Sequence, residues 1–209
     1  VCPLPGAVLR YTLDGSVPTV NSPRYDAPLV IRDDCTLHIR PYHADGRTGD
    51  WIIVRYEKQD YARPLEPRDT EPGLCVDWYF RRFPGCDAIG IPETLYAAGG
   101  RSFRPVRPAG RRAVGMIFRG YIDIPATGIY TFALASDDGA ILRIGGRVVV
   151  DNDGEHPLLE KSGQVALSAG LHPLELRYFD YNGGEIRLVL LGDDGARHPL
   201  DTDLLRHDP

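Results

Sequence analysis

The fold is decided by residues 120–150, which read GYIDIPATGIYTFALASDDGAILRIGGRVVV. Three runs in this stretch are rich in β-branched and aromatic residues and are bounded by Pro, Gly or Asp: Tyr121–Ile124, Ile129–Ala135 and Ile141–Ile144. Short runs of this kind between turn residues predict β-strands. The pair Gly145-Gly146 leads into Arg147–Val150 and predicts a hairpin, since two glycines readily adopt the positive φ angles of a type I′ turn.

The same pattern continues downstream of this stretch. Further strands are expected at Gln164–Leu167, Leu171–Phe179 and Ile186–Leu191, with turn residues between them. Pro173 lacks an amide hydrogen, so it is expected at an edge or near the start of its strand. Six or more strands within residues 73–209 predict a large β-sandwich.

Upstream, a second group of short apolar runs predicts a smaller β domain at residues 1–57, with strands at Val8–Leu13, Leu29–Ile31, Thr36–Tyr42 and Trp51–Tyr56. Between the two groups, residues 58–72 contain three prolines among many charged residues and few apolar ones. We therefore expect residues 58–72 to be a linker. The whole chain is predicted to be all-β, a small sandwich followed by a larger one.

Composition excludes several classes of function. The 209 residues carry a net charge of −5, which argues against a nucleic-acid partner, because affinity for nucleic acid depends on excess Lys and Arg. No apolar run approaches the roughly 20 residues of a membrane-spanning helix, so no membrane span is expected. The chain begins at Val1, and we expect it to be a piece excised from a longer protein.

The four cysteines, Cys2, Cys35, Cys75 and Cys86, lack the paired spacing of zinc sites. This favours disulfides, with Cys75–Cys86 and Cys2–Cys35 preferred among three pairings. A disulfide would indicate an extracytoplasmic location, that is a secreted, periplasmic or cell-surface protein.

Residues near the N-terminus resemble a known module. The sequence LRYTLDGSVPT at residues 9–19, followed by Ser22–Tyr25 and Thr36–Arg40, is similar to the fibronectin-like domain at the C-terminal side of bacterial chitobiases and β-hexosaminidases. The resemblance implies a fibronectin- or immunoglobulin-like sandwich at residues 1–57.

From Gly73 onward the chain resembles a PA-14 domain, a β-sandwich of toxin antigens, fungal adhesins and bacterial glycosidases. The residues that carry the resemblance are grouped in short motifs: Gly120–Pro125, Gly128–Phe132, Ser136–Ala140, Ile144–Gly146, Val149–Gly154 and Ala169–His172. The order of the two modules is similar to the tail of a family 20 glycoside hydrolase, a β-N-acetylhexosaminidase. The resemblance implies an upstream catalytic domain in the same chain and glycans containing N-acetylhexosamine as partners.

The resemblance also implies a metal site. In adhesin members of the family, two consecutive aspartates joined by a cis peptide bind calcium together with an Asn from a later loop, and the ion contacts sugar hydroxyls. Asp137-Asp138 match the aspartates, and Asn182 is the expected third ligand. Carboxylate and amide oxygens suit calcium. The alternative is a plain turn at Asp138-Gly139, whose aspartates bond only local amides.

Tyr181 lies beside Asn182 and is expected to stack on a sugar ring, as aromatic side chains do in carbohydrate sites. No catalytic residues are predicted, because the sequence has no nucleophile elbow, no HExxH motif and no P-loop. We therefore expect a non-catalytic, carbohydrate-binding accessory region of a glycoside hydrolase. The alternative is an adhesin or structural spacer module of a surface protein without glycan affinity.

Overall fold

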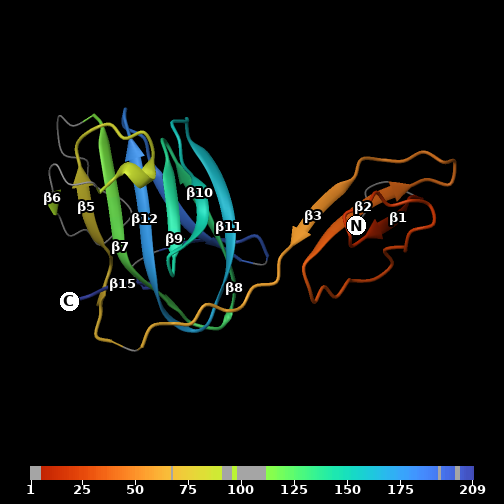
Figure 1. Ribbon diagram of the computed structural model, residues 1–209, viewed down its shortest axis with the longest axis horizontal. Helices are drawn as coiled ribbons and strands as arrows, with labels where there is room; N and C mark the ends of the chain where they lie inside the picture. The colour runs from red at the N-terminus through yellow and green to blue at the C-terminus, as the bar shows by residue number, and fades with distance from the viewer. Residues whose placement is uncertain (1–5, 67, 91–95, 98–111, 193, 201–202) are drawn as a thin grey trace. The chain divides into compact units, whose positions relative to one another are not determined.

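The computed structural model describes all residues except 1–5, 67, 91–95, 98–111, 193 and 201–202. It divides the chain into two compact units, Val1–Gln59 and Asp60–Pro209, which are described separately (Figure 1). Regular secondary structure in the described part consists of strands and one short 3₁₀ helix, which confirms the all-β prediction. It contains no helix that is long and apolar enough to cross a membrane.

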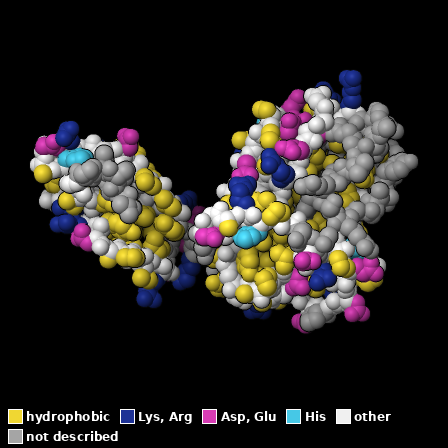
Figure 2. All heavy atoms as spheres, turned by 180° about the vertical axis from the view of Figure 1, so that it is seen from behind, with side chains coloured by type: hydrophobic (Ala, Val, Ile, Leu, Met, Phe, Trp, Pro, Cys, Tyr) yellow, Lys and Arg dark blue, Asp and Glu magenta, His cyan; other side chains and the backbone are white. Residues whose placement is uncertain are grey.

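The first unit is one antiparallel sheet with the order β1-β2-β3, formed by β1 (Val8–Thr12), β2 (Cys35–Tyr42) and β3 (Ile52–Tyr56). Residues 29–31, expected as a strand, form none, so the described part of this unit has one sheet and no second sheet facing it. Ile52 and Ile53 keep 64% and 54% of their surface exposed. Hydrophobic side chains gather on the surface of this unit (Figure 2).

The second unit is a sandwich of two sheets. The larger has the order β10-β9-β12-β7-β15-β4, with β5 beside β7 and β6 beside β5, and the smaller has the order β11-β8-β13-β14. The strands of the larger sheet are β4 (Glu71–Pro72), β5 (Cys75–Tyr79), β6 (Tyr96–Ala97), β7 (Val114–Ile124), β9 (Ala140–Ile144), β10 (Arg147–Asn152), β12 (Gly170–Asp180) and β15 (Leu205–His207). Those of the smaller sheet are β8 (Gly128–Ser136), β11 (Leu159–Leu167), β13 (Ile186–Leu191) and β14 (Arg197–Pro199).

The two faces of the larger sheet differ in character. In β12, Leu174, Leu176 and Tyr178 point into the core between the sheets, while Glu175 and Arg177 alternate with them on the outer face. Such alternation is expected of a strand with one face in a core. The segment after β5, which includes the 3₁₀ helix η1 (Cys86–Ala88), packs over part of that outer face.

Two local predictions can be checked directly. Gly145 and Gly146 have φ angles of 58° and 78°, as the hairpin between β9 and β10 requires. Pro173 lies in β12, which has neighbours on both sides, but β9 pairs with β12 only from Leu174 onward. Pro173 therefore lies near the start of its strand, where the missing amide costs no bond to β9.

The expected linker is shorter than residues 58–72. Ala62 exchanges main-chain hydrogen bonds with Ala166 and Ser168, the amide of Leu65 bonds to the carbonyl of Leu171, and β4 pairs with β15. Most of this segment therefore belongs to the second unit. Its main-chain groups pair with that unit although its side chains are polar, a property that composition does not reveal.

The preferred Cys75–Cys86 disulfide is wrong. Cys75 is exposed on β5, whereas Cys86, in η1, is fully buried against the outer face of the larger sheet, and both are free thiols. Cys35 is also free, and Cys2 lies outside the described residues.

Candidate functional site

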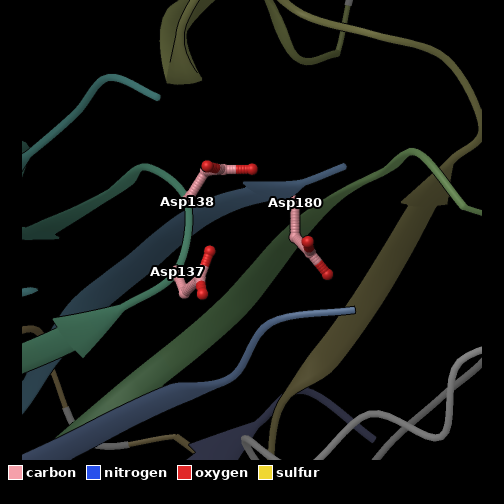
Figure 3. A group of neighbouring side chains, drawn as sticks. All are labelled: Asp137, Asp138 and Asp180. Atoms are coloured by element: carbon pink, nitrogen blue, oxygen red, sulfur yellow. The ribbon is translucent and has the colours of Figure 1, made fainter. Parts of the chain in front are cut away.

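Three aspartates meet at one end of the second unit. Asp137 and Asp138 form the turn between β8 and β9, and Asp180 is the last residue of β12. One carboxylate oxygen of each lies within 4.8 Å of the others (Figure 3). The peptide bond between Asp137 and Asp138 is cis. We call these three residues the aspartate cluster.

Asp180 is held by the loop that follows it. The main-chain amides of Asn182, Gly183 and Gly184 donate to its carboxylate at 2.8, 3.0 and 2.9 Å. A short Asp-Tyr-Asn-Gly-Gly turn suits this arrangement, because aspartate commonly accepts hydrogen bonds from amides a few residues ahead. These main-chain hydrogen bonds fix the Asp180 carboxylate in place.

The main chain of Asp137 is fixed from two sides. Its amide donates to the carbonyl of Glu185 at 3.0 Å, and its carbonyl accepts from the hydroxyl of Tyr178 at 2.6 Å. The neighbouring Asp138 carboxylate accepts from the amide of Tyr181 at 3.1 Å. Strands β12 and β13 thus position the turn that carries both aspartates.

The cluster concentrates negative charge away from water. Asp138 and Asp180 keep only 7% and 0% of their surface exposed, and Asp137 is partly buried. Three carboxylates at this spacing repel one another, and a divalent cation between them would offset that repulsion. All the donors are hard oxygens, which calcium prefers. The residues present therefore fit a calcium ion.

The predicted metal ligands are only partly brought together. Asp137 and Asp138 belong to the aspartate cluster, while Asn182 is exposed in the loop and contributes its main-chain amide to Asp180. Asp180 itself was not predicted. The sequence signal for it is an Asp placed just before an Asn-Gly-Gly turn, which marks a carboxylate that accepts from the turn amides.

Tyr181, expected to stack on a sugar, is in a core. It keeps 7% of its surface exposed, packs against Phe179, and lies under the guanidinium of Arg82 at 4.5 Å. Its hydroxyl bonds to the carbonyl of Phe83, and burial raises its pKa. In this arrangement the ring offers no free face to a sugar, because the segment after β5 covers it.

Comparison with known proteins identifies both units. The PA14 domain matches residues 70–203, and the domain named Fn3 associated matches residues 2–53. The chain belongs to the PA14 domain family. Its second unit is the PA14 domain, which confirms the resemblance described above.

The PA14 chain is also similar to a β-hexosaminidase of Porphyromonas gingivalis. The two are 26% identical over 222 residues, which cover 93% of this chain and 27% of the hexosaminidase. The chain thus spans about a quarter of the length of that relative. Both of its units are included in the match, which is consistent with the tail of a hexosaminidase.

Several solved domains share the fold of the second unit. The PA14 domain of the MpAFP antifreeze protein has a TM-score of 0.54 at 18% identity, covering 72% of this chain and 97% of that one. A PA14 sugar-binding domain from an RTX adhesin has a TM-score of 0.53 at 16% sequence identity. The match covers 65% of this chain and 98% of that one. The epithelial adhesin 6 A domain of Candida glabrata, in complex with Galβ1-3GlcNAc, has a TM-score of 0.51 at 14% sequence identity. The match covers 68% of this chain and 89% of that one.

Proposed function

We propose that this chain is the non-catalytic, carbohydrate-binding accessory region of a secreted or periplasmic glycoside hydrolase related to β-N-acetylhexosaminidases. A calcium ion held by Asp137, Asp138 and Asp180 would contact sugar hydroxyls. The observation that carries the proposal is the convergence of the three carboxylates within 4.8 Å.

The three aspartates supply part of a coordination shell. Calcium takes 6–8 oxygen ligands, so three carboxylates leave positions for the Asn182 side chain, main-chain carbonyls, water or sugar hydroxyls. Asn182 is exposed next to the cluster and has the amide oxygen that such a shell uses. The ion would supply the Lewis acidity that attracts hydroxyl oxygens, and the fixed turn would orient it.

The relatives support the choice of ligand and parent. Two of the solved domains of similar fold come from adhesins, one described as a PA14 sugar-binding domain and one solved with Galβ1-3GlcNAc. The relative that matches both units is a β-hexosaminidase. In this proposal hydrolysis takes place in a catalytic domain of the same parent protein, and the present chain binds its N-acetylhexosamine glycan or shapes its access.

Calorimetric titration with calcium tests the proposal. The expected result is saturable binding that is lost in Asp137→Ala/Asp138→Ala, and heat from β-linked N-acetylhexosamine glycans only when calcium is present. Asp151→Ala is the matched control, because Asp151 is an acidic residue on β10 outside the cluster. Absence of both calcium heat and glycan heat in the folded protein would overturn the proposal.

A second candidate is an adhesin or structural spacer module without glycan affinity. The similarity in fold to domains of adhesins favours it. The parent sequence separates the two candidates: a catalytic domain with paired acidic residues supports the first, and repeats or a surface anchor support the second.

A further inference from the structure

A groove of about 490 Å³ lies on the outer face of the larger sheet, away from the aspartate cluster. Its floor is formed by β7 and β12, and its walls by β5, β9 and β15. This face of the sheet, with η1 lying over part of it, is turned toward the viewer in Figure 1. The volume falls within the range of sites that hold small ligands. We call it the outer groove.

A row of charged side chains crosses the outer groove. Arg119 on β7 and Arg143 on β9 both stand opposite Glu175 on β12 in the strand register. Cross-strand neighbours lie about 5 Å apart at Cβ, so donors and an acceptor alternate across the floor. The two positive charges of the row are offset by Glu175, by Asp77, which accepts from Arg119, and by Asp87, which accepts from Arg143 at 2.8 Å.

This row does not use all of its hydrogen-bonding capacity. The carboxylate of Glu175 accepts from Nε of Arg177 at 2.7 Å, but lies 3.5 Å from Nε of Arg119 and 3.8 Å from Nη1 of Arg143. Hydrogen bonds of this type are normally 2.7–3.2 Å long. Within the described part of the chain, Nη1 of Arg143 has no hydrogen-bond acceptor.

An aromatic ring lies beside the row. Tyr121 stands opposite Pro173 in the register, and both line the outer groove. The Tyr121 hydroxyl donates to Asp208 at 2.8 Å and accepts from Arg68 at 3.1 Å, which fixes the ring. The bond to Asp208 raises the pKa of the Tyr121 hydroxyl above its ordinary value. The floor therefore combines an apolar part with a hydrogen-bonding part.

We propose that the outer groove binds one pyranose unit of an uncharged glycan, independently of calcium. A pyranose has an apolar face of C–H groups, suited to Tyr121 and Pro173, and hydroxyls that both donate and accept, suited to Glu175 and the arginines. The balanced charges of the groove favour a neutral sugar over an acidic one. Along β12, Glu175 and Asp180 are separated by about 17 Å, at ~3.4 Å per residue.

Cys75 provides a reporter for this site, because it is an exposed thiol on the edge of the outer groove. The experiment measures alkylation of each cysteine by iodoacetamide in EDTA, with peptide mapping by mass spectrometry. N,N′-diacetylchitobiose, cellobiose and maltose are the probes. A glycan present at ten times its Kd should slow alkylation of Cys75 about tenfold, since only the unliganded fraction reacts. Cys35, in the first unit, is the internal control.

Two variants separate the outer groove from the aspartate cluster. Glu175→Gln keeps the shape of the side chain and removes the charged acceptor, and it should abolish the protection of Cys75. Asp137→Ala/Asp138→Ala should leave the protection unchanged. Circular dichroism and thermal unfolding verify that each variant is folded, and Tyr121→Ala replaces Glu175→Gln if the latter is not.

Each outcome decides the proposal. Protection in EDTA that survives the aspartate changes and is lost in Glu175→Gln supports it. It is overturned if none of the three sugars protects Cys75, if Cys35 is protected equally, or if protection requires calcium or the aspartates. If the outer groove fails any of these tests but the aspartate cluster still binds calcium, the proposed function is supported and only the outer-groove proposal is overturned.

Discussion

Gly184 packs directly against the carbonyl oxygen of Asp137. A Cβ atom at Gly184 would lie 2.0 Å from that oxygen, far inside contact distance. The same glycine donates its amide to Asp180. One residue without a side chain thus touches two of the three aspartates, and the Asn-Gly-Gly loop closes on the turn between β8 and β9 because of it.

Gly184→Ala is therefore expected to push the loop away from Asp137. The change should lower the free energy of unfolding by about 1–3 kcal/mol, as overpacking usually does, and weaken calcium binding about tenfold or more. Calorimetry and urea unfolding measure the two effects. Gly128→Ala is the control, since its Cβ would meet only Tyr130 at an ordinary 3.7 Å. Unchanged calcium affinity in Gly184→Ala would contradict the role given to the loop.

Asp180→Asn and Asp137→Asn should have different effects. Both oxygens of Asp180 accept main-chain amides, and an asparagine nitrogen cannot accept, so Asp180→Asn should cost about 1–3 kcal/mol of stability as well as calcium affinity. Asp137 engages its neighbours through its main chain, so Asp137→Asn should reduce calcium affinity with little loss of stability. Equal losses of stability in the two variants would show that the hydrogen bonds to Asp180 do not have this role.

The stability of the second unit should fall at high pH because of Cys86. Burial raises the pKa of this thiol above its ordinary value of 9.0, so at rising pH the unfolded chain loses a proton that the folded chain keeps. The free energy of unfolding should decline by up to ~1.4 kcal/mol per pH unit from this group once the pH exceeds about 9.

Urea unfolding at pH 8, 9 and 10 measures this decline. Cys86→Ala should lower stability at every pH and make its pH dependence shallower, whereas Cys75→Ala should leave the pH dependence as it is. Tyr181 and Tyr121, whose pKa values are also raised, contribute mainly above their ordinary pKa of 10.0, so the decline between pH 8 and 10 comes mainly from Cys86. An unaltered pH dependence in Cys86→Ala would refute this account.

His38→Leu is expected to stabilise the first unit. The His38 ring is only 2% exposed, and neither ring nitrogen has a hydrogen-bond partner among the described residues. Replacing an unpaired polar group by an apolar one of similar size should raise the free energy of unfolding by about 1 kcal/mol. Fluorescence of Trp51, whose ring lies 5.5 Å from His38, reports the transition in a Trp78→Phe background. A lower midpoint in His38→Leu would reveal a partner for the ring.

The sequence predicts strands best where one face is buried and the other is not. Strand β13, whose first residues alternate between buried and exposed, has the predicted bounds Ile186–Leu191. Strand β7 begins at Val114, seven residues before the predicted run, because its first five residues are buried on both faces and do not alternate. Strand β11 begins at Leu159, and its exposed first half contains the polar residues Glu160 and Lys161, which pair with β8 at an edge of the smaller sheet. Composition alone does not reveal such a strand.

In the candidate site too, local sequence patterns predict some residues and miss those that only the tertiary fold brings together. A motif placed Asp137 and Asp138, but Asp180 comes from another strand and enters the cluster only through the pairing of β12 with β9. Tyr181 was expected to stack on a sugar because it lies beside Asn182. It is buried by Phe83, almost a hundred residues earlier in the chain, and a single sequence contains no signal for that contact.

Strand β3 has a practical consequence for handling the protein. Within the described part of the chain it pairs with β2 along one edge only, and Ile52 and Ile53 present apolar side chains on both of its faces. An open edge of this kind is a template for another strand. The isolated protein should therefore self-associate as its concentration rises. Added salt should not disperse the assemblies, because the contact between copies is apolar. Detergent at low concentration, or a lysine introduced at Ile52, is the remedy that the structure indicates.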